Sequence, residues 1–393
     1  MFKTGPDFLD PMILERASGH AVYQLDLWMC GTAHCRELLN RAAREADLIL
    51  IEGVMGLYDG RPSSADLAQT FGIPVAAVID AGAMAQTFGA IALGLHQYRP
   101  ALAFHGVLAN GVAGRAHAAM LEESMAGGAR APRFLGFLAR DAALGIPDRH
   151  LGLVQAGEIG DLDARLDRAA DAVASVVNLE ELPKVSFDAQ AAEPPAALLA
   201  GVRIAVARDA ALSFIYAANL DLLRALGAAV RFFSPLEERA LPAADAVYLP
   251  GGYPELHAAR LSANQPLLEA LRAHAEAGRP LLAECGGMML LLEQLIDLEG
   301  RSHPMAGVLR GATIMQPKLQ ALALQAVSFA DGELRGHSFH HSLLSTTEPV
   351  SMRGRTQHGT PGEAVFRRRR LTATYIHLYW PSNPAAAASL FRP

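Results

Sequence analysis

The stretch PLLAECGGMMLLLEQL, residues 280–295, decides how the second half of the chain folds. Its first residues form a short apolar run that predicts a buried strand, and its last residues predict an apolar helix. Cys285 lies at the corner between the two runs, and Gly286 and Gly287 follow it directly. Glycines at that place let a helix pack closely against the strand before it. A strand, a sharp turn with a nucleophile and a helix form a nucleophile elbow, so we expect Cys285 to be an enzyme's nucleophile.

The helix expected after Cys285 bears on the chemistry of the thiol. The positive end of a helix dipole lowers the pKa of a thiol at the helix N-terminus, so we expect a thiolate. Backbone N–H groups at such a terminus, here that of Gly286, also bind an oxyanion. A second N–H donor is expected from the loop LPGGYPE (249–255), which places Gly252 beside Cys285. The alternative is that Cys285 is a small buried apolar residue, as free cysteines commonly are.

A cysteine nucleophile needs a base, and histidine is the usual one. His377 lies at the end of the β-like run TATYIHLYW (372–380) near the C-terminus. The residues alone leave the choice open, because other histidines compete for the role: His257, His274, His303, His337, His340 and His341.

Strands alternate with helices in residues 1–182. The expected strands are 46–56, 73–82 and 103–112, and the expected helices are 33–46, 83–98 and 115–127. This alternation predicts a parallel sheet covered on both faces, with ligands at the carboxyl ends of the strands. Acidic and amide side chains fall at such ends, namely Glu52, Asp59, Asp80 and Asn110.

A Pro- and Ala-rich stretch without periodicity, residues 183–200, reads as a linker. A second α/β unit follows it, with a helix over 213–228 and strands over 202–209, 228–235, 244–255 and 279–284. A chain of 393 residues suits two domains. We therefore expect domains over 1–182 and 201–393, joined by the linker.

Composition narrows the class of protein. A net charge of −6 argues against a nucleic-acid binder. Three cysteines are too few for a disulfide framework and suit a reducing cytoplasm. Neither a signal peptide nor an apolar run of the roughly 18 residues that a membrane span needs is present in the printed sequence, so we expect no membrane partner. The spacing of Cys30 and Cys35 is not that of a zinc site. The arginine run FRRRRL (366–371) is either a solvent-exposed edge or a surface that attracts an anionic polycarboxylate substrate.

Four separated motifs of the second half agree with one family. LPGGYPE, AECGGMMLL, GHSFHHS and ATYIHLYW, in this order, resemble the glutamine amidotransferase domain of the cobyrinic acid a,c-diamide synthase family, through most of residues 201–393. The resemblance implies a class I, flavodoxin-like amidotransferase domain. It implies that Cys285 attacks the side-chain amide of glutamine, that a γ-glutamyl thioester forms and releases ammonia, and that His377 raises the nucleophilicity of Cys285. Tyr379 stands where other class I enzymes carry a Glu, which suggests a less activated histidine and slow glutamine hydrolysis without the other substrates.

The first half resembles the synthetase half of the same family. The motifs are KTGPDFLDP (3–11) and EGVMGLYDG (52–60), and the likeness covers roughly residues 2–182 of a P-loop-type fold related to dethiobiotin synthetase. It implies that ATP activates the a and c acetates of cobyrinic or hydrogenobyrinic acid as acyl phosphates, which ammonia then converts to amides. It implies that Glu52 belongs to the ATP–Mg²⁺ site, that Asp10 and Asp59 position or activate substrate carboxylates, and that Phe8 lies near the substrate. Without the family, Asp7 and Asp10 beside Pro6 and Pro11 read as turn or helix-cap residues.

The phosphate-cradling pattern G-x-x-x-x-G-K-[ST] is not found in the printed sequence. In the family it precedes the motif at 3–11, so we expect the printed sequence to begin inside the synthetase domain. A miscalled start, a fragment and a truncated gene each give that outcome, and a chain of these residues alone is expected not to hydrolyse ATP.

Taken together, the sequence predicts a ligase of two α/β domains that uses glutamine, ATP and Mg²⁺ to amidate a corrin acid in cobalamin biosynthesis. Four alternatives stay open: a glutaminase only, a non-catalytic glutamine- or corrinoid-binding protein, cobyric acid synthase, and nickel sirohydrochlorin a,c-diamide synthase. The cobalt content of the corrin and the oligomeric state, with a homodimer as one option, are also open.

Overall fold

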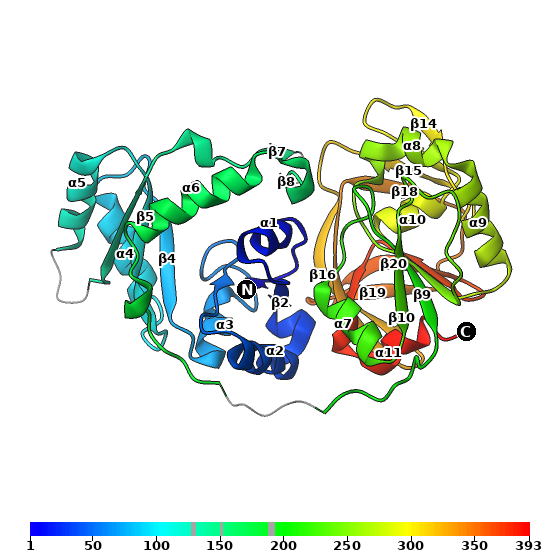
Figure 1. The fold of residues 1–393 in the computed structure, drawn as a ribbon, viewed down its shortest axis with the longest axis horizontal. Helices are drawn as coiled ribbons and strands as arrows, with labels where there is room; N and C mark the ends of the chain where they lie inside the picture. The colour runs from blue at the N-terminus through cyan, green and yellow to red at the C-terminus, as the bar shows by residue number, and fades with distance from the viewer. Residues whose placement is uncertain (127–130, 150–151, 188–192) are drawn as a thin grey trace. The chain divides into compact units, whose positions relative to one another are not determined.

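The chain folds into two compact units in the computed structural model, which describes residues 1–126, 131–149, 152–187 and 193–393 (Figure 1). The first unit comprises Met1–Leu27 and Arg36–Ala191, and the second comprises Trp28–Cys35 and Ala192–Pro393. A short segment of the first half of the chain is thus built into the second unit. Among the helices of the described residues, none combines the length and the apolar character needed to cross a membrane.

The second unit contains a ten-stranded sheet in the order β10-β9-β11-β12-β21-β20-β19-β16-β17-β22. Its first five strands are parallel: β10 (Ala229–Phe233), β9 (Arg203–Ala207), β11 (Ala246–Leu249) and β12 (Leu281–Glu284), where the sequence predicts strands, and β21 (Leu371–Thr374). The remaining five continue the sheet with antiparallel pairs: β20 (Pro361–Arg368), β19 (Met352–Thr356), β16 (Ala321–Phe329), β17 (Gly332–His340) and β22 (His377–Tyr379). The sequence analysis did not predict this antiparallel half.

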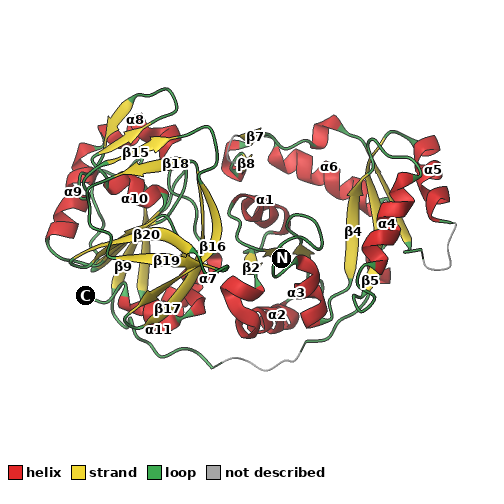
Figure 2. Ribbon diagram, turned by 180° about the vertical axis from the view of Figure 1, so that it is seen from behind, coloured by secondary structure: helices red, strands yellow, loops and turns green. Residues whose placement is uncertain are grey.

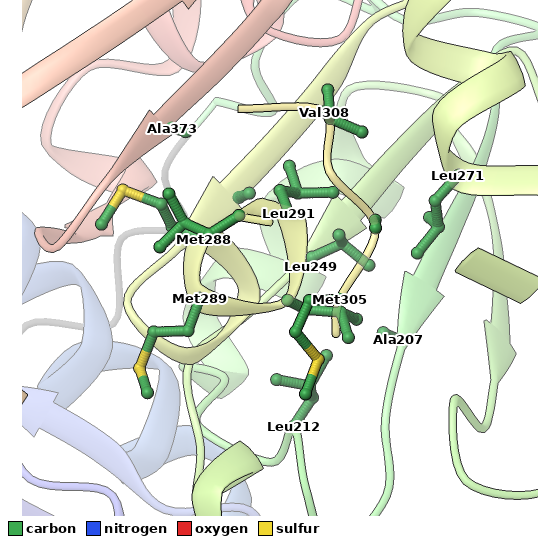
Figure 3. Close-up of a cluster of buried hydrophobic side chains, with 14 of the residues drawn as sticks. Ala207, Leu212, Leu249, Leu271, Met288, Met289, Leu291, Met305, Val308 and Ala373 are labelled. Atoms are coloured by element: carbon green, nitrogen blue, oxygen red, sulfur yellow. The ribbon is translucent and has the colours of Figure 1, made fainter. Parts of the chain in front are cut away.

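Every residue of β11, β12 and β21 is buried, which is typical of parallel strands covered on both faces. One face packs on α8 (Ala258–Ala263), α9 (Gln265–Glu276) and α10 (Gly286–Leu291). The other face packs on α7 (Ala217–Ala225) and α11 (Pro384–Ser389), as Figure 2 lets the reader follow. Met288, Met289 and Leu291 of α10 lie in the first of these cores beside Leu249 and Ala373 (Figure 3).

Two expected helices of this unit are shorter than their apolar patterns suggest. The helix after Cys285 has six residues, because residues Gln294–Ile296 form β13 of a small sheet with β14 (Ser302–Pro304), β15 (Ala312–Met315) and β18 (Ser342–Ser345). The helix expected over 213–228 begins only at Ala217. The residues before it are extended, because Phe214 N–H donates a hydrogen bond to the carbonyl oxygen of Gly251.

The described strands of the first unit fall mainly into two parallel sheets of three strands each. One has the order β2 (Tyr23–Leu25), β1 (Phe2–Thr4), β3 (Ile51–Glu52), and the other the order β4 (Val75–Asp80), β5 (Phe104–Val112), β6 (Phe134–Ala139). The α-helices within its described residues are α1 (Leu9–Ser18), α3 (Ser64–Phe71), α4 (Thr87–Gln97), α5 (Arg115–Met125) and α6 (Leu162–Ala174), and α2 (Thr32–Glu45) belongs to this unit from Arg36 onward. Strand β7 (Asp148–Arg149) pairs antiparallel with β8 (Gly152–Leu153).

The strands expected over 73–82 and 103–112 are confirmed, and Asp80 lies opposite Asn110 in their register. The strand expected over 46–56 shrinks to the two residues of β3, and Leu48 and Leu50 just before it are 44% and 49% exposed. Both β3 and β4 are edge strands of their sheets, and Val78 of β4 is 62% exposed. Glu52 therefore does not share a sheet with Asp80 and Asn110.

Candidate active site

Cys285 occupies a strained corner between β12 and α10. Its backbone angles are φ 46° and ψ −110°, a region that residues other than glycine rarely adopt. The N–H of Cys285 donates to the carbonyl oxygen of Thr374 at 2.7 Å, and the N–H of Met289 donates to the carbonyl oxygen of Cys285 at 3.0 Å. Such strain persists only where the surroundings hold it, and it clusters at active sites. The corner has the form of the nucleophile elbow that the sequence predicts.

The glycines around Cys285 are needed for close packing. A Cβ on Gly287 would lie 2.1 Å from the carbonyl oxygen of Leu249, and a Cβ on Gly252 would lie 2.2 Å from that of Ala211. A Cβ on Gly286 would lie 3.0 Å from the amide nitrogen of Gly252. The two backbone segments that the sequence nominates for oxyanion binding, at Gly252 and Gly286, therefore meet beside the nucleophile.

His377 and Cys285 converge over Gly251. A Cβ built on Gly251 would lie 2.2 Å from His377 Cε1 and 3.3 Å from Cys285 Cβ. Two of the competing histidines have structural partners elsewhere: His274 hydrogen-bonds to the carbonyl oxygen of Pro280, and His303 pairs with Asp297. Of the alternatives left open by the sequence, the geometry favours His377 as the base.

Burial dominates the electrostatics of this pair. Burial, followed by the negative charge of Glu255, raises the pKa of the Cys285 thiol well above its usual value, and the N–H of Gly286 opposes this only in part. The expectation that the helix N-terminus yields a thiolate is therefore wrong. Burial, with smaller contributions from His337 and His340, lowers the pKa of His377 well below its usual value. The resting pair is a neutral thiol beside a neutral imidazole.

The strand that carries His377 is held by two buried polar residues that the sequence analysis missed. Glu284 accepts hydrogen bonds from Leu378 N–H at 3.2 Å and from the Tyr248 hydroxyl at 2.8 Å. Asn219 donates to the carbonyl oxygen of Leu378 and accepts from Trp380 N–H, both at 2.8 Å. The sequence could have indicated Glu284, because this carboxylate ends an apolar strand directly before the nucleophile.

Burial raises the pKa of Glu284 from 4.5 to about 8, which predicts a pH-dependent stability. The folded state then holds a proton that the unfolded state releases, so this stabilisation is complete below pH 4.5 and disappears as pH rises through about 8. The buried histidines, whose pKa values are lowered from 6.5, act in the opposite sense below that pH. Between pH 6.5 and 8 we expect stability to fall by about 1.4 kcal/mol per pH unit on account of Glu284.

Urea unfolding followed by tryptophan fluorescence tests this, since both tryptophans, Trp28 and Trp380, belong to the second unit. The slope is expected to vanish in Glu284→Gln, which keeps the shape of the side chain and cannot ionise. An equal slope in both proteins would contradict the assignment to Glu284.

His337 and Tyr379 complete the surroundings of His377. The ring of His337 stacks on that of His377, with centroids 5.0 Å apart and an angle of 21°, and its Nδ1 lies 2.8 Å from the Tyr216 hydroxyl. Tyr379, which stands where class I relatives carry a Glu, directs its hydroxyl to His34 Nε2 at 3.0 Å within the second unit. His377 is thus supported by a ring stack rather than by a carboxylate at that position.

In the first unit, Lys3 pairs with three acidic residues of the two motifs. Its buried ammonium lies 2.6 Å from Asp10, 3.1 Å from Glu52 and 3.7 Å from Asp7. Burial opposes the charge of Lys3, but the hydrogen bond to Asp10 and the three carboxylates raise its pKa above the usual value. The sequence analysis did not predict Lys3 as a site residue. A lysine shortly before two acidic residues, Asp7 and Asp10, could have indicated this role.

The other acidic residues of these motifs have separate roles. Asp7 caps the start of α1, accepting from Leu9 N–H at 2.9 Å, so the helix-cap alternative holds for Asp7. Burial, followed by the charge of Asp10, raises the pKa of Asp7 to about 6. Asp59 is exposed and accepts from Gly56 N–H at 3.0 Å, and Phe8 is half-buried at the N-cap position of α1. The structure brings Asp10 and Glu52 together on Lys3.

Replacing Lys3 by methionine is expected to destabilise the first unit by about 1–3 kcal/mol, because three carboxylates would lose their common cation. We place the value below that of a fully buried pair, since the Asp10 and Glu52 side chains are 31% and 43% exposed. Urea unfolding by circular dichroism checks this, with the exposed Lys184→Met as the matched control. Equal stability of the two variants would contradict a central role for Lys3.

The geometry around Cys285 agrees with comparisons with known proteins. Residues 203–385 match the model of the CobB/CobQ-like glutamine amidotransferase domain. Over the whole chain, the sequence is 58% identical to a hydrogenobyrinate a,c-diamide synthase of Stutzerimonas stutzeri, of which it covers 91%. The chain belongs to the a,c-diamide synthase family. It is also 57% identical to a hydrogenobyrinate a,c-diamide synthase of Pseudomonas aeruginosa and 52% identical to a cobyrinate a,c-diamide synthase of Herminiimonas arsenicoxydans, covering 90% and 89% of these relatives and 100% of itself in each case.

Membership of the a,c-diamide synthase family bears out the resemblance seen in the sequence. The family's amidotransferase domain accounts for the second unit, whose parallel strands carry Cys285. The first unit contains parallel α/β sheets, and its P-loop character remains a proposal.

Proposed function

We propose that this chain uses glutamine and ATP to amidate the a and c acetate side chains of a corrin acid in cobalamin biosynthesis. The observation that carries the proposal is the strained Cys285 elbow converging with His377 over Gly251, in a chain whose relatives are named a,c-diamide synthases. Relatives named for hydrogenobyrinate are 58% and 57% identical, so hydrogenobyrinic acid is the first substrate to test and cobyrinic acid the second.

The glutamine half-reaction follows from a neutral pair. His377 takes the thiol proton as the Cys285 sulfur attacks the amide carbon, so that no free thiolate is needed in the buried site. The N–H groups of Gly252 and Gly286 stabilise the oxyanion that forms. The imidazolium returns the proton to the departing nitrogen, and ammonia leaves. Water, deprotonated by His377, then cleaves the γ-glutamyl thioester and restores the thiol.

The first unit would activate the carboxylate that receives this ammonia. Mg²⁺ usually takes one or two carboxylates together with phosphate oxygens and water, and Glu52, 43% exposed at the end of β3, fits one such ligand. The metal would offset the charge of the ATP phosphates. Lys3, fixed by Asp10, is positioned to attract an acetate group, and the exposed Asp59 and the nearby Phe8 are proposed to face the substrate. A homodimer and a cytoplasmic location remain proposals.

The test is conversion of hydrogenobyrinic acid in the presence of glutamine, ATP and Mg²⁺, followed by mass spectrometry. The proposal predicts two successive replacements of an acetate oxygen by nitrogen. Glutamine hydrolysis without amide formation would instead support a glutaminase only. Glutamine binding without ammonia release would support a binding protein.

A further inference from the structure

The motif GHSFHHS builds a polar wall beside the nucleophile that the proposed mechanism does not use. His340 stacks on Tyr375, with ring centroids 3.9 Å apart and an angle of 13°. Its Nδ1 lies 3.0 Å from the carbonyl oxygen of Ser342, and its Nε2 lies 3.2 Å from a carboxylate oxygen of Glu363. The Tyr375 hydroxyl is itself fixed by Thr313 at 3.0 Å and Ser342 at 2.8 Å. Glu363 is therefore attached to a pre-organised network.

Glu363 lies at the same edge of the sheet as Cys285, two strands away. Cys285 follows Glu284, which pairs with Thr374 of β21, and Thr374 pairs with Val365 of β20. Because β20 runs antiparallel to β21, Glu363 extends past Val365 toward the edge where Cys285 begins α10. Two strand spacings amount to about 10 Å between backbones.

A negative charge on Glu363 opposes ionisation of the Cys285 thiol unless a cation binds to Glu363. The charge of Glu363 is among those that raise the pKa of Cys285, although burial is the largest cause. The Glu363 side chain is 21% exposed, so one side remains open to a ligand. Glutamine carries one cation, its α-ammonium, four bonds and about 5 Å from the amide carbon that Cys285 attacks.

We propose that Glu363 receives the α-ammonium of glutamine and so selects this amino acid among primary amides. The proposal rests on the glutamine half-reaction proposed above. An ammonium on Glu363 neutralises a charge that opposes thiolate formation, so the correct substrate also assists the attack by Cys285. Glu255 lies elsewhere at the site, in the turn Pro254–His257, whose proline approaches Gly286 of the proposed oxyanion site.

Alkylation of Cys285 by two reagents tests the proposal without the ATP reaction. The diazoketone analogue of L-glutamine carries the α-ammonium, whereas iodoacetamide does not. In Glu363→Gln we expect the diazoketone to react about 10–100-fold more slowly, the value of a charged hydrogen bond, while iodoacetamide reacts as fast or faster. An unchanged diazoketone rate, or an equal slowing of both reagents, would overturn the proposal. Glu255→Gln is the matched control, in which both rates are expected to change by the same factor.

A second measurement compares the hydrolysis of glutamine with that of glutaric acid monoamide, which lacks the α-amino group. The wild-type protein is expected to prefer glutamine by about 10–100-fold in kcat/KM, and Glu363→Gln is expected to lose most of this preference. A preference that persists in the variant overturns the role of Glu363 alone. A wild-type protein that reacts with neither glutamine nor the diazoketone overturns the proposed function itself.

Discussion

Glutamine hydrolysis falls by at least about 10⁴-fold when Cys285 is replaced by serine, because the whole reaction proceeds through the sulfur. A serine hydroxyl is a far weaker nucleophile, and the low basicity of the buried His377 cannot compensate for that difference. In a protein that also carries the phosphate-cradling loop, amidation with ammonium chloride in place of glutamine is expected to continue, since Cys285 has no part in the ATP reaction. Parallel assays with glutamine and with ammonium chloride make the comparison.

Two outcomes would contradict this account. Hydrolysis of glutamine by the serine variant at a rate comparable to the wild type would remove Cys285 from the mechanism. An equal loss of both nitrogen sources would mean that the substitution disturbs the fold, and the tryptophan fluorescence of the second unit would then reveal it.

Gly287→Ala is expected to destabilise the second unit by about 3 kcal/mol or more, because overpacking against backbone cannot be relieved by a rotamer change. The added Cβ would lie 2.1 Å from the carbonyl oxygen and 2.6 Å from the carbonyl carbon of Leu249. Relief requires α10 to move away from β11, which opens the core around Met288 and Leu291. Urea unfolding followed by tryptophan fluorescence measures the effect.

Gly94→Ala supplies the control for this prediction, followed by circular dichroism because Gly94 lies in the first unit and both tryptophans lie in the second. Gly94 lies inside α4, and a Cβ there would meet nothing within 4 Å. Alanine is therefore expected to stabilise the first unit by up to about 1 kcal/mol. A Gly287→Ala protein as stable as the wild type would show that α10 does not depend on this close approach.

The local part of the site was predictable because its causes are local. An apolar strand, a nucleophile and two glycines within eight residues specify an elbow, and the structure has Cys285 at positive φ there. The parallel strands β9, β11 and β12 were likewise visible as short apolar runs, since burial on both faces requires apolar side chains at most positions.

Features that depend on contacts between residues far apart in the chain could not be predicted from local sequence patterns. Without the family resemblance, His377 was separable from its competitors only once β22 had been paired with β17 and its ring placed over Gly251. The thiolate prediction failed because it considered the helix terminus and omitted the burial that tertiary packing imposes on Cys285. Lys3 and Glu284 were missed for a related reason, since a charged residue becomes a site residue only through partners far along the chain, such as Glu52 and Leu378.

The covalent intermediate at Cys285 tests the central claim most directly. The protein is mixed with glutamine, quenched in acid within its turnover time, digested and examined by mass spectrometry. We predict a γ-glutamyl group on the peptide that contains Cys285, and none in Cys285→Ser treated in the same way. A wild-type protein that releases ammonia from glutamine while its Cys285 peptide stays unmodified at every quench time would contradict the account.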